Sequence, residues 1–337
     1  MAAPSLSRPI VIAHRGASGE RPEHTLAAYD LAIAQGADVI EPDLVPTRDG
    51  HLVARHENNI ADTTDVASLD RFADRRTTKT IDGVTTTGWF TEDFMLAEIR
   101  MLRAIERLPH LRPGSAAYDG RYKVPTLQQI IALAKQRSAE TGRVIAIYPE
   151  TKHPSYFDAI GHRLEGRLVV ALRRAGWDSP DAPVFIQSFE VQNLMQLRFM
   201  TRNRLIQLLD ATGGPADGAR PSYAAMTTPE GLADIARYAW GIGPNKDMVQ
   251  AGDAPATTLV QDAHAAGLRN HPWTFRAENR FLDARDRRGD VAAGHGDMTA
   301  AILRQLEAGI DGFFTDFPLL GVRARDRFLA ARGETGT

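Results

Sequence analysis

Short runs of β-forming residues alternate with helix-forming segments along most of this chain. The predicted strands are Ile10–His14, Asp38–Leu44, Arg143–Tyr148, Val184–Ser188, Arg204–Leu209, Trp240–Gly243, Arg269–Phe275 and Gly312–Thr315. Helical patterns lie between them, including Thr25–Gln35, which Gly36 closes, Leu127–Arg137, Phe157–Ala175, Val191–Met200 and Thr299–Ala308. This alternation is typical of βαβ units and a parallel sheet. About eight units is the number found in a (β/α)8, or TIM, barrel.

The competing architecture is a doubly wound open sheet. Such a sheet usually brings a glycine-rich phosphate loop, but neither G-x-G-x-x-G nor G-x-x-x-x-G-K-[ST] occurs in this sequence. The chain has 337 residues, which exceeds the roughly 250 of a typical barrel and leaves room for an insertion. We therefore predict an α/β fold with a single TIM-barrel domain over residues 8–330.

Residues 57–121 do not follow the alternation. They hold many threonines, an Arg- and Asp-rich stretch and scattered Gly and Pro, and they come after a short hairpin strand at His51–His56. We predict an insertion between the second strand and its helix. Connections that follow the strands of a barrel build its active-site face, so this insertion is expected to form a lid or a substrate wall.

The composition excludes several classes of protein. There are 40 Lys and Arg against 42 Asp and Glu, a net charge of -2, which argues against a broad nucleic-acid surface. No apolar run approaches the roughly 20 residues of a membrane span. The chain has no cysteine, which excludes disulfides and cysteine-ligated metals. Met1–Pro9 lacks the basic and apolar regions of a secretory signal, so we expect either a cytoplasmic protein or one whose leader was removed.

Two carboxylates lie two positions apart at the end of the second predicted strand, in Glu41-Pro42-Asp43. Residues two apart on a strand face the same side, and the proline between them fits the end of a strand. Neighbouring carboxylates are costly to bury unless a cation neutralises them, so the pair is either solvated or part of a cation site. Glu150 ends another β-type run, and this third carboxylate would complete an oxygen-rich site for Ca²⁺ or Mg²⁺.

Two histidines also lie at strand ends. His14 ends the first strand beside Arg15, and His56 ends the hairpin strand. A lone histidine is more often structural than catalytic, but this pair indicates acid–base chemistry. Arg15 offers a planar fork of donors to phosphate oxygens. Lys152, two residues after Glu150, would either bind phosphate as well or form a surface ion pair.

The charges favour a substrate that contains phosphate. Three carboxylates contribute −3, a divalent cation +2, and Arg15 with Lys152 another +2, which leaves about +1 to meet an anionic phosphodiester. Signatures of other hydrolases are missing. His56-Glu57 does not extend to H-E-x-x-H, because position 60 is Ile60, and no G-x-S-x-G occurs.

These residues fall within a longer series of motifs. The first motifs are His14-Arg15-Gly16-Ala17, Pro22-Glu23-His24-Thr25, Gly36-Ala37-Asp38, Glu41-x-Asp43, Thr47-x-Asp49-Gly50 and His56. The later ones are Tyr148-Pro149-Glu150-x-Lys152, Gln187-Ser188-Phe189, Gly241-Ile242-Gly243-Pro244, Trp273-Thr274-Phe275-Arg276 and Thr315-Asp316-Phe317-Pro318. Together they resemble the glycerophosphodiester phosphodiesterase family over roughly residues 10–320, and are most similar to its bacterial periplasmic branch. We interpret His24 as structural.

The resemblance implies hydrolysis of a glycerophosphodiester, such as glycerophosphocholine, to an alcohol and sn-glycerol 3-phosphate. Glu41, Asp43 and Glu150 would hold one divalent cation, with Ca²⁺ favoured and Mg²⁺ compatible. His14 and His56 would be the catalytic pair, taken as base and acid, and the glycerol 2-hydroxyl would attack phosphorus to give a cyclic phosphate that water opens. The residues expected to bind the phosphate or the rest of the substrate are Arg15, Lys152, Gln187, Phe189 and Trp273.

Two positions depart from the family pattern, since Glu57 and Asn245 each stand where Asp is common. The close alternative function is a lysophospholipase D that acts on lipid-tailed diesters, for which Phe90, Phe94 and Met95 could supply an apolar groove. A non-catalytic binding module would require the loss of a metal ligand or a catalytic histidine, and none is lost. We expect a small-molecule substrate, no nucleic-acid partner and no stable membrane insertion. The sequence leaves the oligomeric state open.

Overall fold

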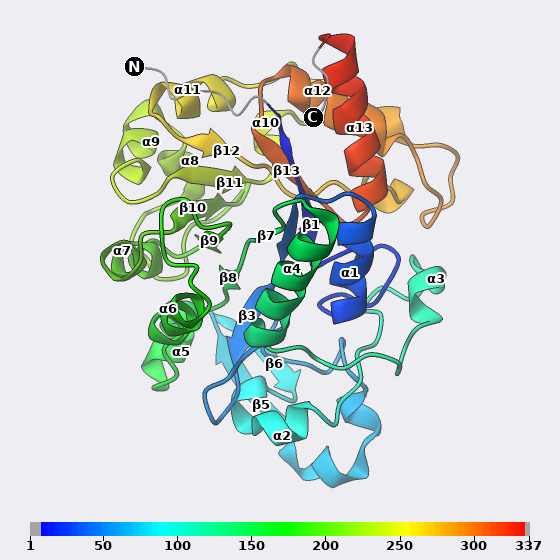
Figure 1. The fold of residues 1–337 in the computed structure, drawn as a ribbon, viewed down its shortest axis with the longest axis vertical. Helices are drawn as coiled ribbons and strands as arrows, with labels where there is room; N and C mark the ends of the chain where they lie inside the picture. The colour runs from blue at the N-terminus through cyan, green and yellow to red at the C-terminus, as the bar shows by residue number, and fades with distance from the viewer. Residues whose placement is uncertain (1–7, 334–337) are drawn as a thin grey trace.

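The strands form a closed parallel barrel in the computed structural model, which describes residues 8–333 (Figure 1). Around the ring they are β1 (Ile10–His14), β2 (Val39–Glu41) with β3 (Asp43–Pro46), β7 (Ala146–Ile147) with β8 (Glu150–Thr151), β9 (Phe185–Ser188), β10 (Arg204–Leu209), β11 (Gly241–Pro244), β12 (Arg269–Asn270) and β13 (Gly312–Thr315). Neighbours pair in parallel, and β1 pairs with both β2 and β13. The Asn270 carbonyl accepts from the Asp311 amide, which closes the ring. The predicted TIM barrel is confirmed.

Two strands of the barrel are interrupted where a proline removes a backbone donor. Pro42 separates β2 from β3, and Pro149 lies between β7 and β8. The interrupted strands pair with each other on both sides of the breaks, and the Glu150 amide donates to the Pro42 carbonyl at 2.9 Å. The predicted strand at Arg143–Tyr148 is therefore shorter than expected. The breaks bring the backbones that carry Glu41, Asp43 and Glu150 side by side.

Helices connect the strands and cover the barrel (Figure 1). The longer ones are α1 (Leu26–Ala34), α4 (Leu127–Thr141), α6 (Glu165–Arg174), α7 (Val191–Met200), α9 (Pro229–Ile235), α11 (Leu259–Ala265), α12 (Met298–Glu307) and α13 (Pro318–Ala331). The shorter ones are α5 (Pro154–Ala159), α8 (Tyr223–Met226), α10 (Lys246–Val249), η4 (Asn279–Phe281) and η5 (Ala284–Asp286). As predicted, Gly36 follows α1 in the left-handed region, at φ +95°. The prediction of one helix over Phe157–Ala175 is wrong, because Gly161 turns at φ +77° and separates α5 from α6.

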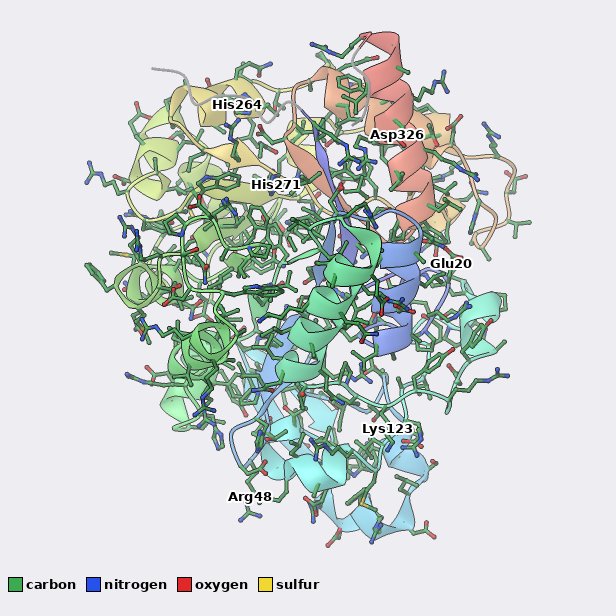
Figure 2. All side chains as sticks on the ribbon, viewed as in Figure 1. Glu20, Arg48, Lys123, His264, His271 and Asp326 are labelled. Carbon is green, nitrogen blue, oxygen red and sulfur yellow. The ribbon has the colours of Figure 1, made fainter. Side chains whose placement is uncertain are left out.

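Apolar side chains fill both sides of the strands, as expected for a parallel barrel. Ile12, Phe185, Ile206 and Phe314 belong to a buried cluster inside the barrel. The alternate residues of the same strands belong to a larger cluster that the helices share. His271, labelled in the upper part of Figure 2, is also fully buried, and its Nδ1 lies 2.9 Å from the Tyr148 hydroxyl. The barrel is therefore a packed core, and ligands have access only at its ends.

The chain between β4 (Leu52–Ala54) and α4 leaves the barrel and extends from one end of it, in cyan in Figure 1. Its elements are η1 (Asp65–Ser68), η2 (Asp70–Arg75), β5 (Thr77–Ile81), β6 (Val84–Gly88), η3 (Thr91–Asp93), α2 (Leu96–Ile99) and α3 (Pro113–Ala116). β4 pairs antiparallel with β3, so the predicted hairpin strand is present. The domain limits drawn at 8–330 and 57–121 stay a prediction.

Residues 1–7 lie outside the described part of the chain, and with them most of the segment inspected for a leader. Within residues 8–333, no helix combines the length and the apolar character that crossing a membrane would require.

Candidate active site

A cavity of about 310 Å³ opens at the carboxyl-terminal ends of the strands. It is lined by His14, Arg15, Glu41, His56, Glu150, Gln187, Phe189, Leu208, Asp210, Trp273 and Phe314. Asp43 and Lys152 lie against this lining, since Arg15 Nε is 3.3 Å from Asp43 Oδ2 and Lys152 Nζ is 3.0 Å from Glu150 Oε1. The fold thus gathers at one place all the site residues named from the sequence.

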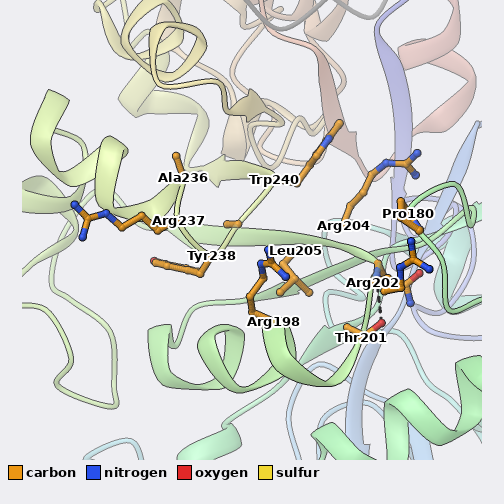
Figure 3. Close-up of a pocket in the computed structure, with 12 residues that line it drawn as sticks. Pro180, Arg198, Thr201, Arg202, Arg204, Leu205, Ala236, Arg237, Tyr238 and Trp240 are labelled. Carbon is orange, nitrogen blue, oxygen red and sulfur yellow. Dashed lines mark hydrogen bonds between the residues drawn. The ribbon is translucent and has the colours of Figure 1, made fainter.

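A larger cavity, of about 550 Å³, lies at the opposite end of the barrel (Figure 3). It surrounds the amino-terminal ends of β10 and β11, and Arg198, Arg202 and Arg204 are among its side chains. No carboxylate or histidine is among the residues that line it. Catalytic groups of barrel enzymes come from the carboxyl-terminal ends of the strands, so the smaller cavity is the candidate active site.

Three buried carboxylates form a candidate metal site at that end. Glu41, Asp43 and Glu150 each offer one ligand oxygen, and these oxygens lie within 4.8 Å of one another. Burial and the Asp43 charge raise the pKa of Glu41 well above its usual value, and burial raises the pKa of Glu150 to about 8 in spite of Lys152. Without a cation the three groups therefore do not all ionise at neutral pH. Such a set of hard oxygen donors fits a divalent cation.

Asp43 keeps its negative charge because its neighbours provide a hydrogen-bond donor and a positive charge. Burial alone would raise its pKa, but a hydrogen bond with His24 and the charge of Arg15 lower it well below its usual value. His24 is fully buried, with Nε2 at 2.9 Å from Asp43 Oδ2 and Nδ1 at 2.7 Å from the Tyr29 hydroxyl. The structural interpretation of His24 was therefore incomplete, since this residue orients a member of the carboxylate cluster.

Glu41 is held at both carboxylate oxygens. The Arg15 backbone amide donates to Oε2 at 2.8 Å, and Gln187 Nε2 donates to Oε1 at 3.1 Å. Arg15 directly follows the end of β1, and its backbone is in the left-handed region, at φ +60°. Gln187, predicted to contact substrate, is thus also a neighbour of the carboxylate cluster.

His14 belongs to a buried chain of charges. Its Nδ1 is 2.6 Å from Asp316 Oδ1, and Asp316 Oδ2 accepts from Arg112 Nη2 at 2.5 Å and from Arg276 Nε at 2.9 Å. Burial would raise the pKa of Asp316, but Arg276 and Arg112 lower it well below its usual value. Burial, and then the charge of Arg15, lowers the pKa of His14 to about 4. Because Asp316 is ionised, the neutral His14 ring donates from Nδ1 and leaves the Nε2 lone pair free.

His56 has a similar arrangement on the other side of the cavity. Its Nδ1 is 2.9 Å from Glu57 Oε1, and its Nε2 is 3.4 Å from Lys152 Nζ. Burial, followed by the charges of Arg15 and Lys152, lowers the pKa of His56 to about 3. Two neutral imidazoles therefore face one cavity, each with a carboxylate at Nδ1. This arrangement suits proton transfer at both Nε2 atoms.

The two predicted phosphate-binding cations are held in place by buried carboxylates. Arg15 Nη1 donates to both oxygens of Glu23 at 3.2 Å, and Lys152 contacts Glu150. Burial lowers the pKa of Lys152, but Glu150 and Asp43 outweigh this effect and raise it above its usual value. Both side chains therefore stay positively charged next to the histidines.

Aromatic rings form the apolar wall of the cavity. Phe189 and Trp273 meet edge to face at 5.7 Å, and Trp273 Nε1 donates to the Gly243 carbonyl at 2.8 Å. Asp210 lines the same cavity and accepts from Asn245 Nδ2 at 3.1 Å. A carboxylate at position 245 would face Asp210, so the amide explains how this departure from the family pattern is accommodated.

Several residues of the site had no role assigned from the sequence. Asp316 lies in the motif Thr315-Asp316-Phe317-Pro318, and its place at the end of the last strand was the signal that could have found it. Arg112 carries no such signal, because it comes from the segment between β4 and α4, 204 residues before Asp316. Its partner Glu278, 2.6 Å from Arg112 Nε, likewise lies in a loop.

A parallel barrel with catalytic-type side chains gathered at the ends of its strands is the architecture of an α/β-barrel enzyme. The model of the Glycerophosphoryl diester phosphodiesterase family matches residues 14–320. The chain therefore belongs to this family of enzymes, as its motifs predicted.

Curated relatives match along most of the chain. The chain is 35% identical over 327 residues to the glycerophosphodiester phosphodiesterase GDPD6 of Arabidopsis thaliana, covering 92% of this chain and 84% of the relative. It is 28% identical over 342 residues to the glycerophosphodiester phosphodiesterase of Haemophilus influenzae, covering 93% and 88%. The assignment to a bacterial periplasmic branch stays a prediction.

Solved structures share the fold. A phosphodiesterase of Oleispira antarctica, solved in complex with the product sn-glycerol-3-phosphate, superposes with a TM-score of 0.64 at 20% identity and covers 95% of this chain and 97% of its own. A glycerophosphodiester phosphodiesterase of Agrobacterium tumefaciens gives a TM-score of 0.57 at 20% identity, covering 94% and 99%.

Proposed function

We propose that this enzyme hydrolyses water-soluble glycerophosphodiesters, such as glycerophosphocholine, to an alcohol and sn-glycerol 3-phosphate. The observation that carries the proposal is the convergence, in one cavity, of a three-carboxylate cluster, two neutral histidines and two fixed cations. The Oleispira antarctica fold neighbour, solved with sn-glycerol-3-phosphate as its product, supports the choice of product.

Glu41, Asp43 and Glu150 would hold one divalent cation. These donors are carboxylate oxygens, which suit Ca²⁺ and Mg²⁺, and we take Ca²⁺ as the natural ion. When bound, the cation acts as a Lewis acid toward the phosphate oxygens. It would also stabilise the ionised carboxylates, since burial, followed by repulsion from Asp43, raises the pKa of Glu41 and Glu150 without a cation.

The two histidines divide the proton transfers between them. His14 is the base, because the ionised Asp316 at its Nδ1 stabilises the imidazolium that forms when Nε2 takes the proton of the glycerol 2-hydroxyl. That hydroxyl oxygen attacks phosphorus while Arg15 and Lys152 bind the phosphate oxygens. His56, neutral in the free enzyme, first takes up a proton from solvent at Nε2; it then gives this proton to the departing alcohol oxygen as the bond from phosphorus to that oxygen breaks.

The cyclic phosphate formed in this step is opened by water with the histidine roles exchanged. His56, now neutral, takes a proton from the water, and His14 returns its proton to the glycerol 2-oxygen as that bond to phosphorus breaks. The product is sn-glycerol 3-phosphate. Phe189 and Trp273 provide an apolar wall for the carbon atoms of the substrate, and Gln187 positions Glu41.

The lysophospholipase D alternative is less well supported. Phe90 and Phe94, the residues named for an apolar groove, are fully buried in the core, and only Met95 of that group is exposed, at 42%. Of the three residues named for the groove, only Met95 is therefore available to contact an acyl chain. We therefore retain water-soluble diesters as the substrates.

The test is release of glycerol 3-phosphate from glycerophosphocholine after treatment with EDTA, and again after Ca²⁺ or Mg²⁺ is restored. The variants Glu41→Ala and His14→Ala, each checked for folding, are compared with Glu307→Ala, which changes an exposed glutamate at the end of α12. Metal-dependent turnover that both site variants lose and the control keeps would support the proposal. A well-folded, metal-loaded wild type without turnover would contradict it.

A further inference from the structure

Glu57 connects His56 to a second histidine. While Oε1 of Glu57 lies at His56 Nδ1, Oε2 lies 2.9 Å from Nε2 of His153. The other ring nitrogen of His153, Nδ1, is 2.5 Å from Oδ2 of Asp82. The four side chains therefore form an unbroken chain of hydrogen bonds that begins in the active-site cavity.

Asp82 is the tip of the β5–β6 hairpin, which belongs to the segment between β4 and α4. Ile81 pairs with Val84, so Asp82 and Gly83 form a two-residue turn in which both have positive φ, +50° and +80°. Asp-Gly is a favoured sequence for such turns. The hairpin strands are largely exposed, and the contact with His153 ties their tip to the barrel.

The contact is formed between residues in uncommon conformations. His153, like Asp82, lies in the left-handed region, at φ +46°, just before Pro154. A non-glycine residue is uncommon in this region, so contacts with the surroundings must hold it there. The His153 side chain is 14% exposed, and with carboxylates at both ring nitrogens it is a doubly protonated cation. Burial lowers its pKa, but the bonds to Asp82 and Glu57 outweigh this effect and raise it to about 9.

Protonated His153 lies between the carboxylates of Asp82 and Glu57, and it determines the contact that Glu57 makes with His56. Burial would raise the pKa of Glu57, but its bonds to His153 and His56 lower it far below the usual range, so it stays an ionised acceptor. An ionised Glu57 requires the proton of neutral His56 to be on Nδ1 and leaves Nε2 for the cavity. The longer arm of glutamate, compared with aspartate, allows one carboxylate to contact both histidines.

We propose that Glu57, His153 and Asp82 are positioning residues for His56. Through these three residues, docking of the β5–β6 hairpin fixes the tautomer and the orientation of the His56 ring. The inference rests on the proposed role of His56 in catalysis. It adds that an element of the segment between β4 and α4 sets the state of a catalytic group in the active-site cavity. The same hairpin tip also lines a cavity of about 340 Å³ that shares Glu150 and Phe189 with the active site.

The variants Asp82→Asn and His153→Asn test the chain with little change to the backbone. Asparagine tolerates the left-handed region, and Asn-Gly is as favourable in the turn as Asp-Gly. The matched control is His264→Asn, which removes a histidine–carboxylate pair of 2.8 Å, formed with Asp311, on the side of the barrel away from the cavity. Circular dichroism establishes that all three variants are folded.

The first readout is spectroscopic and does not need activity. A two-bond proton–nitrogen spectrum of histidine-labelled protein distinguishes the Nδ1–H from the Nε2–H form of neutral imidazole. We expect wild type and His264→Asn to hold His56 in the Nδ1–H form. Asp82→Asn and His153→Asn should give a mixture of the two tautomers. An unchanged His56 signal in both site variants would overturn the proposal.

The second readout is kinetic. Positioning predicts that kcat for glycerophosphocholine falls about tenfold in either variant, a part of the ~10²–10⁴ that acid–base catalysis supplies, while KM changes little. The double variant should be no slower than His153→Asn alone, because the two residues act in series. A rise in KM with unchanged kcat would show that the hairpin only lines the cavity, which also overturns the proposal. If wild type itself has no turnover, the proposed function fails, and the spectrum still decides whether Glu57, His153 and Asp82 position His56.

Discussion

The buried carboxylate cluster should make a contribution to stability that is lost as the pH rises in the metal-free enzyme, and a bound divalent cation should abolish this contribution. In the folded protein burial raises the pKa of Glu150 from 4.5 to about 8, in spite of the charge of Lys152. A carboxyl group with a raised folded pKa stabilises the folded state below its unfolded pKa. That contribution is lost as the pH rises through the folded value. The window is therefore from pH 4.5 to about 8.

The size of the effect follows from the pKa difference. Glu150 is only 7% exposed, so solvent screens the shift little. At about 1.4 kcal/mol per pKa unit, the change from 4.5 to about 8 corresponds to about 5 kcal/mol over the whole window. Glu41, whose pKa burial and Asp43 also raise, acts in the same direction. A loss of this size is comparable with the entire stability of many domains.

The assay is urea unfolding at closely spaced pH values across this window, in EDTA and in excess Ca²⁺. We expect the free energy of unfolding in EDTA to fall relative to that in Ca²⁺ as the pH rises across the window, because ligand carboxylates are ionised when a cation is bound, whereas the histidines contribute to both curves. Calorimetry near pH 7 in buffers of different ionisation enthalpy should show proton release on Ca²⁺ binding. Glu150→Gln should reduce the slope in EDTA, whereas the exposed-site variant Glu307→Gln should leave it unchanged. Parallel curves in EDTA and Ca²⁺, with no proton release, would refute the reasoning.

Three further outcomes are expected from other parts of the molecule. Asp316→Asn should lower kcat roughly 10²- to 10⁴-fold with the fold intact, since His14 loses the acceptor that fixes its tautomer; steady-state kinetics and circular dichroism check this. Ile206→Ala, inside the barrel, should lower the free energy of unfolding by about 2–5 kcal/mol in urea titrations. The raised pKa of His153 stabilises the fold below pH 6.5, and this contribution is lost as the pH rises toward about 9. His153→Asn should therefore flatten that part of the stability curve, by up to about 3 kcal/mol.

The part of the site that could be predicted from sequence is the part built from strand ends. Glu41 and Asp43 are two residues apart around a proline, and His14 ends a run of apolar residues, so local pattern places all three at the end of a strand. A parallel barrel brings the carboxyl ends of its strands to one face. The strand assignment alone was therefore enough to predict that Glu150 lies beside Glu41 and Asp43.

The partners that determine the protonation of these residues could not be predicted in this way. His14 and Asp316 are 302 residues apart and meet only because β13 closes the ring against β1. Arg112 comes from a segment without the periodicity of a strand or a long helix. Local patterns also overestimated the regular elements. β12 ends at Asn270, and beyond it the chain continues through isolated pairs such as that of Phe275 with Thr315.

Both departures from the family pattern become understandable only from such distant partners. Asn245 avoids a second carboxylate beside Asp210, 35 residues earlier, and Glu57 reaches His153, 96 residues later. Asn245 differs from aspartate in charge, and Glu57 differs from it in length. The side chain that each one contacts follows the end of a different strand. A sequence comparison marks these positions as deviations, whereas the structure shows a partner that fits each one. The chemistry of this barrel end is therefore specified by pairs of residues, so variants at position 57 or 245 are best made together with variants of their partners.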